Sequence, residues 1–71
     1  MGNRPNYKEY LILDALEDYI NKKGESPTLE ELCSMTGILA TSTIYKCLKS
    51  LQKKGYVEVK PRTRRGISLI K

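Results

Sequence analysis

The chain has 71 residues, 13 of them basic and 8 acidic, so it forms one small domain with a net charge of +5. It has two cysteines and no histidine, and no Ser-Lys or paired-carboxylate arrangement stands out, so we expect no metal site, no cofactor and no enzyme. Phe and Trp are absent, and no membrane-spanning run or signal peptide is present, so we expect a soluble, cytoplasmic protein with an aliphatic core.

The first predicted element is an amphipathic helix over residues 7–22. Its apolar side chains follow the i, i+3, i+4, i+7, i+8 spacing of one helix face, and they are Ile12, Leu13, Leu16, Tyr19 and Ile20. The acidic side chains are predicted to lie off that face, at Glu9, Asp14, Glu17 and Asp18. Gly24 can adopt the left-handed conformation that ends a helix, and Pro27 follows it.

A second, shorter helix is predicted over residues 28–36. Thr28 and Glu31 have the spacing of a capping box, in which each side chain bonds a backbone N–H at the start of the helix. The inward positions would be Leu29, Leu32 and Cys33. Gly37 ends this helix and forms the turn that follows.

The third predicted helix covers residues 41–54 and ends at Gly55. The Thr41-Ser42-Thr43 cluster is suited to capping its start. Its inward positions have helical spacing and are Ile44, Cys47, Leu48 and Leu51. The opposite face is polar, basic or aromatic, and is free to contact a partner through Ser42, Thr43, Tyr45, Lys46, Lys49 and Lys53.

The last predicted element is a β-hairpin over residues 56–70. Side chains alternate between apolar and polar along residues 56–60 and 67–69, which is typical of strands with one buried face. The loop between them carries three arginines at its exposed tip: Arg62, Arg64 and Arg65. Three helices followed by a two-stranded wing predict an α+β fold of the winged helix-turn-helix type.

The charge is unevenly distributed along the chain. Residues 1–40 carry four basic and seven acidic side chains, a net −3, whereas residues 41–71 carry nine basic and one acidic, a net +8. Like charges concentrated in one half repel each other, and a nucleic acid would relieve that repulsion. A helix about 10 Å wide enters the major groove of duplex DNA, and the third helix has this shape. Lys49, Lys53 and Lys54 lie in the later turns of that helix and are expected to meet phosphates or solvent.

Several stretches resemble the N-terminal DNA-binding domain of LexA repressors. They are residues 28–33, 37–45 and 48–59 and the Arg65-Gly66-Ile67 run, and together the resemblance covers roughly residues 7–70. The run from Gly37 to Tyr45 is most similar to the forms found in Gram-positive bacteria. The turn is one residue longer than in the commonest helix-turn-helix pattern, as it is in that family.

The resemblance implies that the first turns of the third helix enter the major groove. The candidate DNA-binding residues are Thr41, Ser42, Thr43, Tyr45, Lys46, Lys49 and Lys53 on this helix, and Arg62, Arg64 and Arg65 on the wing. We expect a nucleoid-associated bacterial transcriptional regulator or repressor, bound to double-stranded DNA as two copies on a palindromic site. LexA repressors continue into a self-cleaving domain that these 71 residues lack, so we expect an excised domain or a stand-alone regulator.

Two other functions remain open from the sequence. A winged helix can serve as a protein-interaction module, with its basic face bound to an acidic partner. Binding to structured RNA is disfavoured because the A-form major groove is too deep and narrow for a helix. Cys33 and Cys47 lie on apolar stripes and are interpreted as small core residues, with a redox switch as the alternative.

Overall fold

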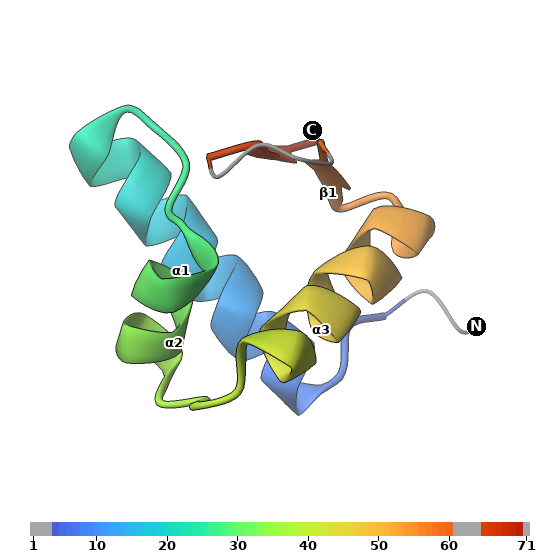
Figure 1. The fold of residues 1–71 in the computed structure, drawn as a ribbon. Coiled ribbons are helices and arrows are strands. Elements are labelled where there is room, and N and C mark those ends of the chain that lie inside the picture. The colour runs from blue at the N-terminus through green and yellow to red at the C-terminus, as the bar shows by residue number, and fades with distance from the viewer. Residues whose placement is uncertain (1–3, 61–64, 71) are drawn as a thin grey trace.

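The computed structural model describes residues 4–60 and 65–70. The elements are the helices α1 (Tyr7–Lys23), α2 (Leu29–Thr36) and α3 (Thr41–Lys54) and the strands β1 (Val57–Val59) and β2 (Ile67–Leu69). The hairpin follows the C-terminal end of α3 and reaches across toward the C-terminal half of α1 (Figure 1). The structure thus confirms the predicted α+β fold, with three helices and a C-terminal two-stranded wing.

Helix α1 begins at a capping box that involves a buried acid. The Asn6 side chain accepts a hydrogen bond from the Glu9 N–H at 2.9 Å, and the Glu9 carboxylate accepts one from the Asn6 N–H at 3.0 Å. Glu9 is only 3% exposed, so the prediction that it lies off the buried face is wrong. It lies three residues before Ile12 and therefore on the same face of the helix.

Helix α2 begins at the predicted capping box and ends at a glycine. The Thr28 hydroxyl accepts from the Glu31 N–H at 3.1 Å, and the Glu31 carboxylate accepts from the Thr28 N–H at 2.8 Å. Because Thr28 is the cap, the first helical residue is one later than predicted. Gly37 has φ +80°, a left-handed conformation that residues with a Cβ rarely adopt, and it turns the chain toward α3.

Helix α3 starts without a side-chain cap. Its N-cap residue is Ala40, whose carbonyl accepts hydrogen bonds from the N–H groups of Thr43 and Ile44 at 3.1 and 3.2 Å. The prediction that the Thr41-Ser42-Thr43 cluster caps this helix is wrong, because the helix already includes Thr41. The hydroxyl groups in the first turn of α3 therefore do not cap the helix to which they belong.

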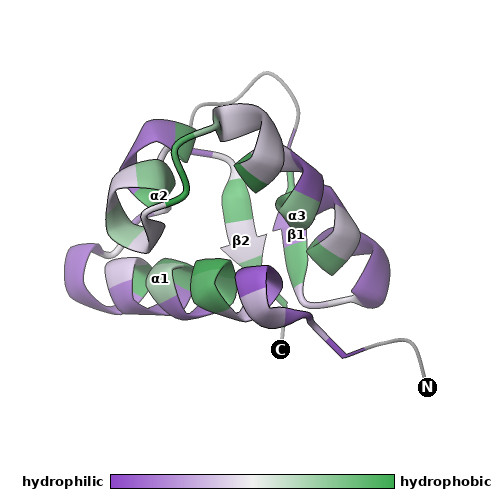
Figure 2. Ribbon diagram, turned by 90° about the horizontal axis from the view of Figure 1, so that it is seen from below, coloured by the Kyte–Doolittle hydropathy of each residue, from purple (hydrophilic) through white to green (hydrophobic). Residues whose placement is uncertain are grey.

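The core is aliphatic and draws on every helix and both strands. Its buried side chains are Ile12, Leu16, Leu32, Ile44, Leu48, Leu51, Val57 and Ile67. Figure 2 shows the hydrophobic stretches of the three helices and the strands facing the centre that they enclose. Each fully buried side chain of this size stabilises the fold by about 1.5–3 kcal/mol.

The two strands are antiparallel and short. Val57 lies opposite Leu69 and Val59 opposite Ile67, which places one apolar face of the hairpin against the helices. Further backbone bonds extend the pairing at both ends, from the Lys60 N–H to the Gly66 carbonyl and from the Ile70 N–H to the Tyr56 carbonyl. None of the helices in the described part of the chain is long and apolar enough to cross a membrane.

Candidate nucleic-acid interface

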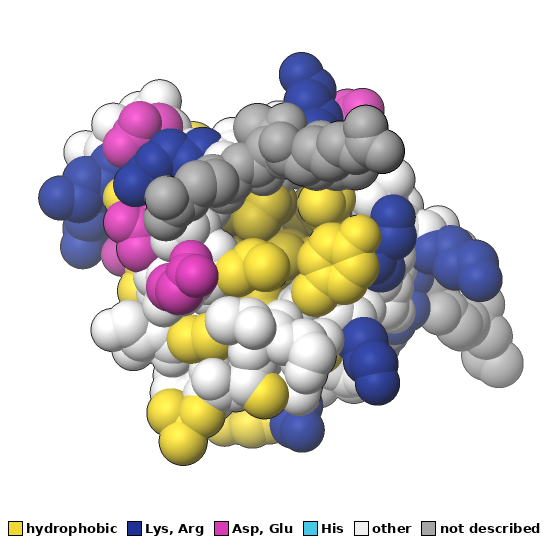
Figure 3. Space-filling model, viewed as in Figure 1, with side chains coloured by type: hydrophobic (Ala, Val, Ile, Leu, Met, Phe, Trp, Pro, Cys, Tyr) yellow, Lys and Arg dark blue, Asp and Glu magenta, His cyan; other side chains and the backbone are white. Residues whose placement is uncertain are grey.

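The outward face of α3 carries the side chains that the sequence predicted for DNA. Burial of Ile44, Leu48 and Leu51 fixes the rotation of the helix, so the opposite face meets solvent. Thr43 is half-buried there, and the exposed candidates are Thr41, Ser42, Tyr45, Lys46, Lys49 and Lys53. Figure 3 shows basic side chains along the side of the molecule where α3 lies, and acidic and basic side chains together on the opposite side.

An aromatic side chain and a cation lie one turn apart on this face. The Lys49 ammonium is 6.0 Å from the centre of the Tyr45 ring, within range of a cation–π attraction. Tyr45 is 44% exposed and is not among the residues packed against the core. The pair presents an apolar surface, a hydroxyl and a positive charge together to whatever approaches α3.

The turn between α2 and α3 exposes an apolar residue to which the sequence prediction gave no role. Leu39 is 92% exposed, whereas its neighbour Ile38 packs against the core. The Ile38 N–H donates to the Thr36 hydroxyl at 3.2 Å, which ties the turn to the end of α2. An apolar residue next to an inward-facing one, just before the start of α3, was the only sequence signal for it.

Lys54 has a different environment from its basic neighbours on α3. Its ammonium lies 2.7 Å from the Glu9 carboxylate and donates to the Arg4 carbonyl at 3.1 Å. The prediction that Lys54 meets phosphates or solvent is therefore wrong. Burial raises the pKa of Glu9, but hydrogen bonds from Lys54, Ser50 and the Asn6 backbone outweigh it and leave that pKa below its ordinary value.

The predicted wing arginines are only partly within the described structure. Arg62 and Arg64 lie outside the described residues. Arg65 is described, and its guanidinium points toward the start of α2, where it pairs with the Glu31 carboxylate at 3.1 Å. The hydrogen bond from the Thr28 N–H and the pairing with Arg65 lower the pKa of Glu31 to about 2.

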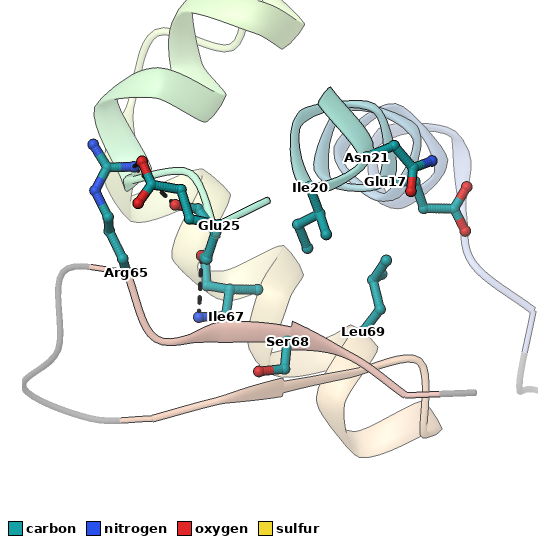
Figure 4. A pocket seen from close by; sticks show the side chains of 9 residues that line it. Glu17, Ile20, Asn21, Glu25, Arg65, Ile67, Ser68 and Leu69 are labelled. Carbon is teal, nitrogen blue, oxygen red and sulfur yellow. Dashed lines mark hydrogen bonds and ion pairs between the residues drawn. The ribbon is translucent and has the colours of Figure 1, made fainter. Parts of the chain in front are cut away.

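A groove lies between α1 and β2, on a part of the surface that α3 does not line. Ile20 of α1 and Leu69 of β2 face each other across it, and Arg65 borders one end (Figure 4). Its volume is about 620 Å³, and it is open to solvent. Arg65 is the only candidate DNA-binding residue among its described lining residues.

The cysteines and acids of the described residues do not form a metal centre. In the ranges 4–60 and 65–70, no three side chains of the metal-ligating types come together. Cys33 and Cys47 are half-buried free thiols that pack against the core. Burial and the nearby Glu9 carboxylate raise the pKa of Cys47, which lowers the fraction of reactive thiolate.

Comparison with known proteins identifies the family. The family model described as the LexA DNA binding domain matches residues 8–66, from the first turn of α1 to the residue before β2. The chain belongs to the LexA DNA-binding domain family. Its LexA-type helix-turn-helix comprises α2, the turn at Gly37 and α3. The family membership confirms the resemblance seen in the sequence.

LexA repressors of several bacteria are similar to this chain. The chain is 36% identical over 70 residues to the LexA repressor of Acetivibrio thermocellus, covering 99% of this chain and 33% of the relative. It is 36% identical over 63 residues to the LexA repressor of Caldicellulosiruptor saccharolyticus, with 89% and 31% covered. For that of Clostridioides difficile the identity is 35% over 63 residues, with 89% and 30% covered. The chain thus spans about a third of the length of these relatives.

Proposed function

We propose that this LexA-type domain binds double-stranded DNA sequence-specifically, as a bacterial transcriptional regulator or repressor. The outward face of α3 is the observation that carries the proposal. It begins directly after the helix-turn-helix turn, lacks a side-chain cap and presents hydroxyls, a tyrosine and lysines to solvent. Such a face matches the base edges and phosphates of a major groove. The domain acts by binding alone, in the cytoplasm at the nucleoid.

Different parts of the interface have different roles in this proposal. The first two turns of α3 read bases and the nearest backbone, through Thr41, Ser42, Thr43, Tyr45 and Lys46. The exposed Leu39 beside them offers an apolar contact of the kind that thymine methyl groups accept. The later lysines of α3 and the wing arginines neutralise phosphates, through Lys49, Lys53, Arg62 and Arg64. Two copies bind the half-sites of a palindrome.

A titration of duplex DNA at several salt concentrations tests the proposal. Selection from a random duplex library first supplies a preferred site, and fluorescence anisotropy then compares that site with a scrambled one. We expect binding that weakens steeply with salt, and a Lys46→Ala variant that loses about 1–3 kcal/mol of discrimination between the two sites.

Lys23→Ala is the matched control for Lys46→Ala. Lys23 is also exposed but lies in the last turn of α1, away from α3, so its removal is expected to leave the discrimination between the two sites unchanged. Absence of duplex binding even at low salt refutes the proposal. Equal losses from both variants would refute the roles assigned to α3.

A further inference from the structure

The side chain of Arg65 joins the wing to the other half of the molecule. Its two terminal nitrogens pair with both oxygens of the Glu31 carboxylate, at 3.1 and 3.3 Å. Nη1 also donates to the Ser26 carbonyl at 2.8 Å and to the Tyr19 hydroxyl at 3.3 Å, and it lies 3.6 Å from the Glu25 carboxylate. One guanidinium therefore contacts α1, α2 and the loop between them.

A second contact two residues further on fastens the same strand. The Ile67 N–H of β2 donates to the Ser26 hydroxyl at 3.2 Å, and Ser26 is buried (Figure 4). The Ser26 hydroxyl in turn donates to the Pro27 carbonyl at 3.0 Å. Two contacts thus join the second half of the wing to the segment that leads into α2. One is made by the Arg65 side chain and the other by the Ile67 backbone N–H.

The acid that receives Arg65 is itself held in place. Glu31 forms the capping box of α2, so its carboxylate bonds the Thr28 N–H at 2.8 Å while it pairs with Arg65. A two-point pairing between a guanidinium and a fixed carboxylate is directional and needs little further ordering. A DNA phosphate that took both terminal nitrogens of Arg65 would have to displace both oxygens of this partner.

We propose that Arg65 is a positioning residue for DNA binding: its pairing with Glu31 sets the wing against the helix-turn-helix, and Arg65 itself contacts no phosphate. This inference rests on the proposed DNA binding. Arg64 precedes Arg65 directly in the chain, so fixing the position of Arg65 limits the positions that Arg62 and Arg64 can take. A wing that is already ordered loses less conformational entropy when DNA binds.

The Glu31→Gln variant separates positioning from simple charge. Glutamine keeps the capping box, because its side-chain oxygen can still accept from the Thr28 N–H, but it loses the ionic pairing with Arg65. If charge alone mattered, removing an acid near DNA would strengthen binding. If positioning matters, Glu31→Gln weakens binding by about threefold to tenfold, and Arg65→Ala weakens it by a similar factor.

Salt-dependent anisotropy on the selected duplex carries the test, for the wild type, Arg65→Ala, Arg65→Lys, Glu31→Gln and the Arg65→Ala/Glu31→Gln double variant. We expect the double variant to bind no more weakly than either single one, and the plot of log K against log salt to keep the wild-type slope. Lys53→Ala is the matched control, because losing a phosphate contact makes that slope shallower by about 0.9.

All titrations are run below the unfolding temperature of each variant, which circular dichroism supplies. If Arg65→Ala does not fold, Arg65→Lys and Glu31→Gln still decide the question. A slope shallower by about 0.9 for Arg65→Ala, together with tighter binding by Glu31→Gln, would overturn the inference while leaving the proposed function standing. A wild type that does not bind duplex DNA overturns both.

Discussion

Lys53 and Lys54 are adjacent in sequence, yet we predict that only one of them stabilises the fold. Lys53 is exposed, whereas the Lys54 side chain is 20% exposed and pairs at 2.7 Å with a Glu9 carboxyl group that is 4% exposed. Replacing Lys54 with methionine keeps the length of the side chain but removes its charge. The carboxylate of Glu9 is then left buried without its cationic partner.

The size of the loss follows from this geometry. Removing one partner of a fully buried ion pair costs about 3–5 kcal/mol. Glu9 retains the hydrogen bond from the Asn6 N–H, and Lys54 has some access to water, so we expect a loss of about 2–3 kcal/mol. A domain of 71 residues has a total unfolding free energy of about 4–11 kcal/mol, so this is a large share.

Urea unfolding followed by circular dichroism measures the loss. The control Lys53→Met is expected to change the unfolding free energy by less than about 0.5 kcal/mol. Adding Glu9→Gln to Lys54→Met should recover part of the loss, because the neutral amide keeps the capping box of α1 without leaving a buried charge. If Lys54→Met is as stable as Lys53→Met, the pair contributes nothing and the reasoning fails.

Two further predictions concern acid pH and the core. The pKa of Glu31 falls from its ordinary 4.5 to about 2 on folding. Its contribution to stability is therefore complete above about pH 4.5 and is lost as the pH falls toward 2. Urea midpoints measured across this pH range should fall less steeply with decreasing pH for Glu31→Gln than for the wild type. Leu48 is completely buried, and Leu48→Ala should cost about 2–4 kcal/mol in the same unfolding assay, whereas an alanine at exposed Lys49 should cost little.

Local signals in the sequence were sufficient to predict the elements of this fold. The apolar spacing of α3 predicted which face is buried, and the structure buries Ile44, Leu48 and Leu51 as expected. The capping box at Thr28 and Glu31 is present because both partners lie within one turn of helix. The outward face of α3 could be predicted for the same reason, since it is the face opposite the buried one.

The wrong cap of α3 was a local error of one residue, whereas the ion pairs that the sequence did not predict join residues far apart in the chain. Glu9 was assigned to the surface because it is charged, but its partner Lys54 is 45 residues away. Arg65 is exposed, as predicted, but its pairing with Glu31 was not predicted, because Glu31 is 34 residues away and was already explained by the capping box. Helical periodicity describes only neighbours within a few turns, so it could not pair these charges.

The two long-range pairs also change the expected salt dependence of DNA binding. Both join a cation from the basic C-terminal half to an acid from the N-terminal half, so part of the charge asymmetry is neutralised within the fold. Of the nine basic residues of the C-terminal half, Lys60 and Lys71 are not among the DNA candidates. Counting Lys54 and Arg65 would give seven cations for DNA, but without them five remain: Lys46, Lys49, Lys53, Arg62 and Arg64. At about 0.9 per neutralised phosphate, the slope of log K against log salt should not exceed about 4.5 in magnitude per copy, rather than about 6.3. A measured slope near 6 per bound domain would show that the internal pairs open on DNA and release their cations to phosphates.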